Sequence, residues 1–129
     1  MRYHLKIEDC SSQGAPRGEA VCVIAEGEFC GGVFTLNYPF DGARYVLKIC
    51  GNCVYHQRIG DTQMMLEFRQ GEKTHGTLKS GEMCGSLDIY THELKTAVTA
   101  NGCSVRLVYS DFADSKLLTV KNITAYQVK

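Results

Sequence analysis

The strongest constraint on the fold is a period-two alternation of apolar and polar residues that recurs along nearly the whole chain. Successive side chains of a β-strand point to opposite faces, so this period predicts strands with one buried face. Turn-forming glycine and asparagine residues separate the alternating runs, and no run of helical period is long enough to predict a helix. We expect an all-β domain with strands near residues 2–8, 20–29, 33–38, 44–50, 53–59, 63–69, 73–79, 85–91, 94–100, 103–110 and 116–127.

The turns predict which side chains share a face, because residues paired across a hairpin point to the same side of the sheet. A two-residue turn at Gly51–Asn52 and a loop at 60–62 predict the pairs Ile49–Val54, Leu47–His56, Tyr45–Arg58 and Arg58–Met64. A turn at Gly31–Gly32 pairs Phe29 with Phe34. Turns at His92–Glu93 and Asn101–Gly102 add Leu87, Ile89, Thr91, Leu94, Thr96, Val98, Ala100, Cys103, Val105, Leu107 and Tyr109 to this face.

The resulting face is mostly apolar, whereas the opposite face is charged and carries Arg44, Lys48, Gln57, Glu67, Arg69, Asp88, Lys95 and Arg106. This division over many short strands predicts a closed antiparallel barrel of about eight to ten strands. A β-sandwich has the same alternation, so the period alone does not choose between them. The 129 residues suffice for one domain, residues 1–129. The register after Ser110 stays open, because Leu117–Leu118 fits either face.

Composition argues against several classes of function. The 14 Lys and Arg residues equal the 14 Asp and Glu residues, which gives no basic surplus for nucleic acid or for an anionic membrane surface. The first eight residues alternate and do not form the apolar run of a signal peptide. We therefore expect a cytoplasmic protein whose seven cysteines are thiols.

Short glycine and aromatic motifs run through most of the chain: Ala25–Phe29, Phe34–Tyr38, Leu47–Ile49 with Gly51, Arg58 with Gly60, Phe68 with Gly71, Gly76–Leu78, Leu87–Thr91 and Leu107–Tyr109. Over about residues 20–127 the sequence resembles the YwiB-like family of uncharacterised bacterial β-barrel proteins. The resemblance implies a calycin-like, lipocalin-like barrel and brings no catalytic residues. The chain departs from the family pattern at Thr74–Gly76 and in its high cysteine content.

Arg58 and His56 are the most informative candidates for a site, because the hairpin register turns both toward the apolar face. A buried guanidinium needs an anion, a carboxylate or water. In one interpretation Arg58 binds a carboxylate or phosphate, and the ligand also contacts His56, Tyr45, Tyr109, Thr91, Thr96 and Met64. In the other interpretation, which we favour for Arg58 taken alone, its aliphatic chain packs on Met64 and its guanidinium group reaches solvent or Asp61.

Cys50–Gly51–Asn52–Cys53 has the CxxC spacing of a redox pair or half a zinc site. It falls on a hairpin turn, not at a helix N-terminus, and no second ligand pair accompanies it. We interpret the two cysteines as exposed thiols and predict no metal, no cofactor and no catalytic residue.

Three functions follow for comparison. The leading hypothesis is a non-catalytic barrel that binds a small amphiphilic or anionic molecule. The alternative is a protein-interaction module that uses the rim or an outer patch of Val46, Tyr55, Ile59, Tyr90 and Val108, with a homodimer as one form. The third is a small lyase or isomerase in which His56 and Arg58 act as acid–base and anion clamp.

Overall fold

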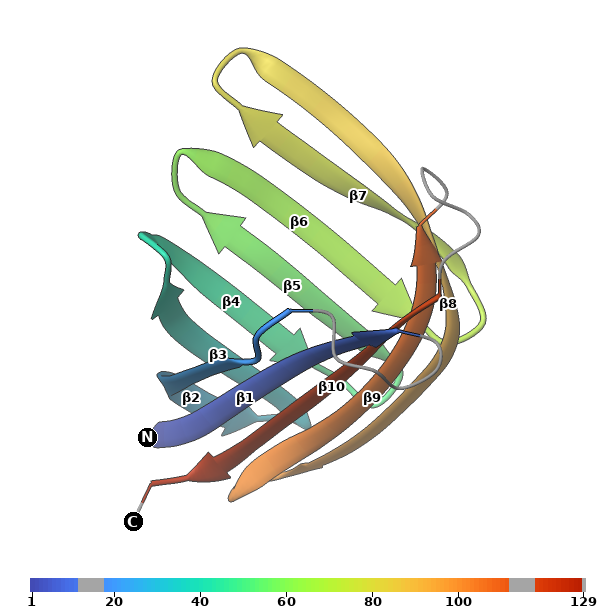
Figure 1. Ribbon diagram of the computed structural model, residues 1–129. Coiled ribbons are helices and arrows are strands. Elements are labelled where there is room, and N and C mark those ends of the chain that lie inside the picture. Colours follow the sequence, from blue (N-terminus) through green and yellow to red (C-terminus); the bar gives the residue numbers. More distant parts are fainter. Residues whose placement is uncertain (12–17, 112–117, 129) are drawn as a thin grey trace.

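The computed structural model describes residues 1–11, 18–111 and 118–128. Ten antiparallel strands form one closed sheet, in which each strand pairs with its neighbours in sequence and β1 pairs with β10 (Figure 1). The strands are β1 (Arg2–Ser11), β2 (Val21–Cys30), β3 (Val33–Phe40), β4 (Ala43–Ile49), β5 (Cys53–Ile59), β6 (Thr62–Arg69), β7 (Lys73–Ser80), β8 (Met83–Thr99), β9 (Gly102–Asp111) and β10 (Leu118–Gln127). The predicted closed antiparallel barrel is thus confirmed, and the sandwich is excluded.

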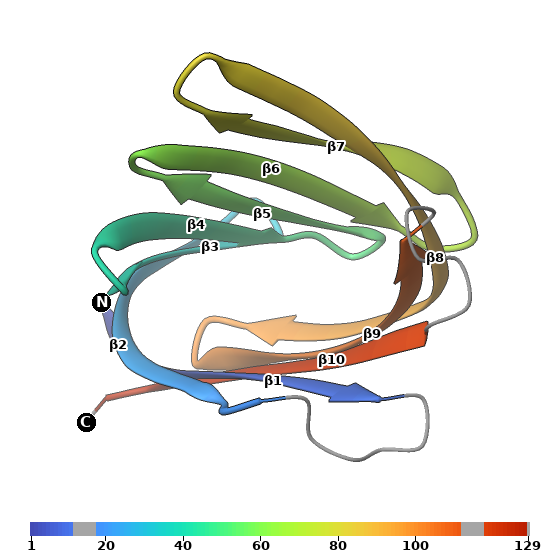
Figure 2. The same cartoon turned by 45° about the horizontal axis from the view of Figure 1, so that its top comes forward.

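The barrel has two distinct ends. One carries both termini and the turns at 31–32, 51–52 and 100–101, and the other carries the turns at 41–42, 60–61 and 81–82. Figure 2 shows β3–β6 on one side of the barrel and β9, β10 and β1 on the other, with the long β8 curving from β7 round to β9. Residues 116 and 117, the first two of the last predicted strand, lie outside the described residues. No helix in the described part of the chain is long and apolar enough to cross a membrane.

The registers of three hairpins agree with the sequence prediction. Phe29 pairs with Phe34, Tyr45 with Arg58, and Arg58 with Met64. At Gly51–Asn52 the amide of Cys50 donates to the carbonyl of Cys53 at 2.8 Å, which closes the two-residue turn. Local turn chemistry therefore determined these registers.

The predicted turn at His92–Glu93 is wrong, because β8 runs without a break from Met83 to Thr99. His92 is instead the extra residue of a β-bulge between Thr91 and Glu93. The bulge shifts the alternation by one residue, which keeps Leu87, Ile89 and Thr91 on the same face as Leu94, Thr96 and Val98.

The connection from β6 to β7 pairs with the bulge. The amide of Gly71 donates to the carbonyl of Thr91 at 2.9 Å, and the amide of Thr91 donates to Glu72 at 3.2 Å. The Gln70 side chain accepts from the amide of Leu94 at 2.5 Å and donates to the carbonyl of His92 at 3.1 Å. These contacts take up the backbone groups that the bulge removes from the regular ladder.

The predicted turn at Asn101–Gly102 is displaced by one residue. Ala100 and Asn101 form the turn, so Val98 pairs with Cys103 and not with Val105. Gly102 lies inside β9, where a Cβ atom would come within 2.1 Å of the Ala125 carbonyl oxygen on β10. The glycine therefore permits a close approach of two strands, a contact that local turn propensity does not reveal.

The apolar interior is packed with side chains from every strand except β7. Phe34, Leu36, Leu47 and Leu107 are completely buried. Gly27 makes room for the Tyr3 ring, since a Cβ atom there would lie 2.5 Å from Tyr3 Cε2. The rest of the buried cluster comprises Tyr3, Leu5, Ile7, Ala25, Tyr38, Ile49, Val54, Phe68, Ile89, Leu94, Cys103, Val105, Ile123 and Ala125.

Candidate functional site

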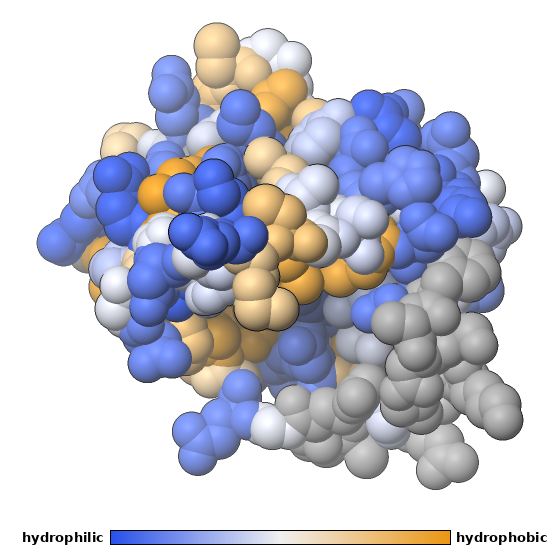
Figure 3. Space-filling view, turned by 90° about the horizontal axis from the view of Figure 1, so that it is seen from above, coloured by the Kyte–Doolittle hydropathy of each residue, from blue (hydrophilic) through white to orange (hydrophobic). Residues whose placement is uncertain are grey.

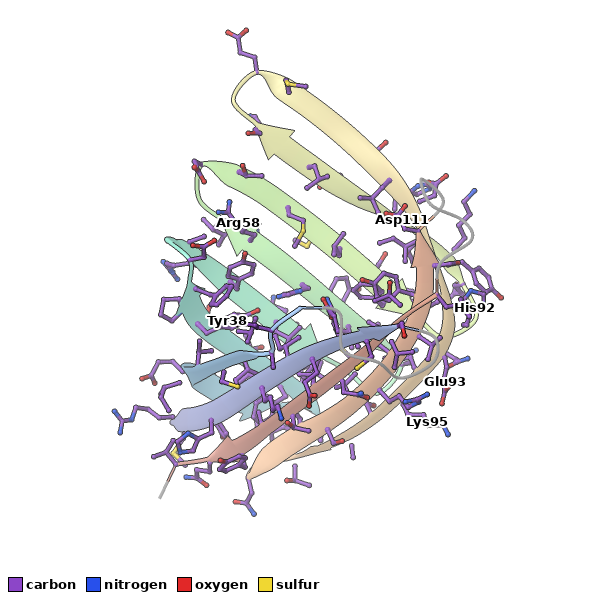
Figure 4. All side chains as sticks on the ribbon, viewed as in Figure 1. Tyr38, Arg58, His92, Glu93, Lys95 and Asp111 are labelled. Carbon is purple, nitrogen blue, oxygen red and sulfur yellow. The ribbon has the colours of Figure 1, made fainter. Side chains whose placement is uncertain are left out.

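Polar inward-facing side chains gather at the end of the barrel opposite the termini. We call this set the polar mouth; it consists of Asp9, Tyr38, Tyr45, His56, Arg58, Tyr109 and Lys121. It draws on both sides of the barrel, from β3–β5 and from β1, β9 and β10. Figure 4 shows Arg58 near the upper end of β5 and Tyr38 deeper in the barrel.

Arg58 is held by the turn that follows its own strand. Its side chain is 20% exposed, and Nε donates to the Tyr45 hydroxyl at 3.2 Å. Nη1 donates to the carbonyl of Thr62 and forms an ion pair with Asp61 at 3.3 Å. The hydrogen bond from the Thr62 amide, followed by that from Arg58, lowers the pKa of Asp61. This geometry agrees with the interpretation that places the Arg58 head at the rim beside Asp61.

His56 is buried at 7% exposure, and its Nε2 shares a 2.7 Å hydrogen bond with the Tyr38 hydroxyl. Burial, with a smaller effect of the positive charge of Lys121, lowers the pKa of His56 to about 3. Burial also raises the pKa of Tyr38, with smaller effects from Tyr45 and Asp9. Both groups are therefore uncharged near neutral pH.

Lys121 is a charged residue of the interior that the sequence prediction missed. Its side chain is only 10% exposed, and Nζ lies 3.7 Å from Asp9 Oδ1 and 6.0 Å from the centre of the Tyr109 ring. The sequence leaves the register after Ser110 open, so the inward direction of Lys121 does not follow from it. For Asp9 a signal existed, since it continues the alternation of Tyr3, Leu5 and Ile7.

Aromatic rings line the β3–β5 side of the mouth. Tyr38 and Tyr45 stack with their ring centres 5.2 Å apart and an interplanar angle of 9°. Tyr45 also lies 5.6 Å from His56 and 6.4 Å from Phe40, whose side chain is 41% exposed. Tyr38, which is not among the predicted site residues, thus links the aromatic wall to His56.

The structure brings most, but not all, of the predicted site residues together. Tyr45, His56, Arg58 and Tyr109 belong to the polar mouth, and Met64 pairs with Arg58 at its edge. Thr91 pairs with Tyr109 but is completely buried, and its hydroxyl has no hydrogen-bond partner among the described residues. Thr96 lies toward the opposite end, where its hydroxyl donates to Gly51 at 3.1 Å. Thr96 is therefore not part of the polar mouth, because residues on the same face of the sheet can lie at different heights along the barrel axis.

The pair of cysteines at the β4–β5 turn differs from the prediction of two exposed thiols. Cys53 is buried, and Cys50 is half-buried. Burial raises the pKa of the Cys50 thiol, and its hydrogen bond with the Cys53 side chain raises it further. A raised pKa disfavours the reactive thiolate. Within residues 1–11, 18–111 and 118–128, no three His, Cys, Asp or Glu side chains group as metal ligands do.

Two surface hollows of the described residues lie mainly between outward side chains. Val46, Tyr55 and Met65 line one of about 170 Å³, and His4, Ile24 and Tyr126 contribute to another of about 390 Å³. The predicted outer patch does not form one surface, because Val46 and Tyr55 lie on β4 and β5 whereas Tyr90 and Val108 lie on β8 and β9. Ile59 is the most exposed residue of the predicted patch, at 39%.

The fold and the mouth together define a class: an up-and-down antiparallel barrel with a packed apolar interior and one polar end. A family profile matches residues 5–124, and the chain belongs to that family, described as a domain of unknown function (DUF1934). The crystal structure of the YwiB protein from Bacillus subtilis is similar in fold, with a TM-score of 0.78 and 16% identity over 99% of this chain and 91% of that one. No curated protein matches the sequence. The predicted resemblance is confirmed.

Proposed function

We propose that this protein is a non-catalytic binding barrel whose polar mouth takes up a small amphiphilic or anionic molecule. The observation that carries the proposal is the gathering of charged and polar inward side chains at one end of an otherwise apolar interior. Binding sites for small molecules combine apolar walls with a few polar groups that fix orientation. The mouths of β-barrels are a common place for such sites.

Lys121 supports an anionic ligand. An ammonium group has three donors, and its charge is costly to bury unless it is paired and hydrogen-bonded. Among the described residues, the carboxylate oxygen that pairs with Lys121 is on Asp9 at 3.7 Å, beyond ordinary hydrogen-bond distance. An anion in the mouth would give Lys121 a closer partner. Arg58 adds a second positive charge at the rim, although Tyr45, Thr62 and Asp61 already use its Nε and Nη1 donors.

His56 favours binding over acid–base catalysis. A general base works best with a pKa near the operating pH, whereas burial holds the pKa of His56 at about 3. Its described side-chain partner is the Tyr38 hydroxyl, not a carboxylate that would orient a catalytic imidazole. The hydrogen bond between His56 and Tyr38 instead fixes two uncharged polar side chains in the wall of the polar mouth.

The proposal is tested by native mass spectrometry of protein from its own cell and by calorimetric titration with fatty acids, nucleotides and tetrapyrroles. We expect a bound acid and an affinity that falls at least tenfold in Lys121→Met, since a charge-assisted contact contributes about 1.5–3 kcal/mol. The matched control is Lys95→Met, because Lys95 pairs with one carboxylate, Glu93 at 3.2 Å, on the outer face (Figure 4). A ligand-free mass with no binding across all three classes would refute the proposal.

A second candidate is an interface on the outer face of β1, β2 and β10. Ile24 is 44% exposed and Tyr126 63% exposed beside the hollow of about 390 Å³, and exposed apolar groups of this size suit a protein partner or a second copy. Light scattering distinguishes this candidate: a dimer that Ile24→Glu dissociates would support it, and a monomer at all concentrations would count against the homodimer.

A further inference from the structure

The hairpin of β7 and the Met83 end of β8 stands away from the rest of the barrel (Figures 1 and 2). We call it the lip. β6 pairs with β7 only from Thr62–Ser80 to Met65–Thr77, so the lip joins β6 through a short ladder beside the polar mouth. The registers place its inner face on the same side of the sheet as the inward side chains of the mouth.

The inner face of the lip is apolar but incompletely packed. Leu78 points inward and is 39% exposed, whereas Leu36, Leu47 and Leu107 inside the barrel are completely buried. Met64, its cross-strand neighbour, is half-buried. Seen from above, apolar side chains gather between hydrophilic areas on this side of the molecule (Figure 3).

The strand registers align these apolar groups with a cation. Arg58 pairs with Met64, Met64 with Leu78, and Leu78 with Gly85, so the four residues form one inward-facing row across β5, β6, β7 and β8. Neighbouring strands lie about 4.8 Å apart, which gives the row a length of roughly 14 Å. The row begins at a positive charge, continues over two flexible aliphatic side chains and ends at a glycine.

The glycine end of the row has open space. Apart from the two chain neighbours of Gly85, no atom of the described residues lies within 4 Å of a Cβ atom placed on it. Gly76, the inward-facing residue two positions before Leu78 on β7, has no such open space. A Cβ atom there would lie 2.8 Å from Leu66 Cδ2 and 3.3 Å from Leu87 Cδ1. Leu66 and Leu87 thus close the wall below the row, whereas Leu78 and Gly85 at the far end of the row are exposed.

We propose that the ligand is an acid with an unbranched aliphatic chain, whose acid group lies in the polar mouth and whose chain lies along Met64, Leu78 and Gly85. This assignment rests on the proposed function and adds the chemical class of the ligand and its direction. Charge complementarity selects this occupant: the row starts at Arg58 and faces the mouth that holds Lys121. Burying a chain over this surface gains affinity with each methylene, about fourfold for the 0.8 kcal/mol of a fully buried one.

Methionine methyl NMR tests the position of the chain with sodium decanoate as the probe. The Met64 methyl signal should shift saturably, while Met65, which follows it and points outward with 37% exposure, should not. This neighbour is the control within the same protein. A Met64 signal that stays unchanged at decanoate concentrations where calorimetry detects binding would overturn the assignment.

Gly85→Leu tests the path of the chain by filling the open end of the row. We expect the affinity for decanoate to fall at least tenfold and that for hexanoate to change less than threefold, because the shorter chain ends before Gly85. Ser86→Leu, on the exposed outward side of the same strand, is the matched control and should bind both acids as before.

The outcomes separate the two proposals. If Lys121→Met abolishes binding and Gly85→Leu leaves decanoate affinity unchanged, the assignment of the chain is wrong and the proposed function stands. If no acid binds the unaltered protein, both are wrong. A dimer that Gly85→Leu dissociates would place a second copy on the lip and would overturn the assignment.

Discussion

The buried His56 predicts a specific dependence of stability on pH. Its pKa is about 3 in the folded protein, against 6.5 for an unperturbed histidine, mainly because burial disfavours the imidazolium. The unfolded chain therefore binds a proton between these values that the folded chain does not. The contribution of His56 to stability is complete above about pH 6.5 and is lost progressively as the pH falls toward 3.

The size of the effect follows from the two pKa values. At about pH 4.5, two units below the unfolded value and above the folded one, the loss is about 3 kcal/mol, since one unit corresponds to 1.36 kcal/mol. Other groups also titrate in this range, so the comparison needs a variant without the imidazole. His56→Gln removes the titration and keeps a polar group beside the Tyr38 hydroxyl.

Urea unfolding at about pH 7 and about pH 4.5 measures this difference. The free energy of unfolding of the unaltered protein should fall by about 3 kcal/mol more than that of His56→Gln over this interval. His92→Gln is the control, because His92 is exposed on the outside of β8, and it should keep the full dependence (Figure 4). Equal pH dependence in the unaltered protein and His56→Gln would refute the reasoning.

Two further predictions concern the bulge and the cysteines. Gln70→Ala removes two hydrogen bonds to the β8 bulge and should lower the free energy of unfolding by about 1–3 kcal/mol, whereas Gln70→Glu keeps the acceptor for Leu94 and should cost less; equal losses in urea titrations would contradict this bonding. In the native protein an aromatic disulfide reagent should react fast with the exposed thiols and slowly with the buried ones, and fast labelling of Cys53 on peptide mapping would contradict its burial. The fast set is Cys22, Cys30 and Cys84, and the slow set is Cys10, Cys53 and Cys103.

The sequence correctly predicted features that depend on residues close together in the chain, and it missed features that depend on residues far apart in the chain. The hairpins at Gly31–Gly32, Gly51–Asn52 and 60–62 were placed correctly, because their registers depend on the turn and its flanking residues. The bulge at His92 was missed, because its backbone groups are satisfied by residues 70–72, about twenty positions earlier. Gly102 was read as a turn residue because the strand that approaches it, β10, is distant in sequence.

The candidate site shows the same division. Alternation turned His56 and Arg58 inward, and the structure places both in the polar mouth. Alternation does not give the position of a residue along the barrel axis. The sequence therefore groups Thr96 with residues of the polar mouth, although it lies toward the opposite end of the barrel. Asp9 and Lys121 face each other only through the pairing of β1 with β10.

The sequence by itself determined an antiparallel all-β chain with one apolar face, because strand period and turn propensity are encoded within a few residues. The tertiary structure decided that the sheet closes between β1 and β10, that the lip stands apart, and that Lys121 meets Asp9 beside His56. The closure of the sheet and the Lys121–Asp9 pair join residues more than a hundred positions apart. Their energies come from packing and charge burial across the barrel, which no local pattern of residues contains.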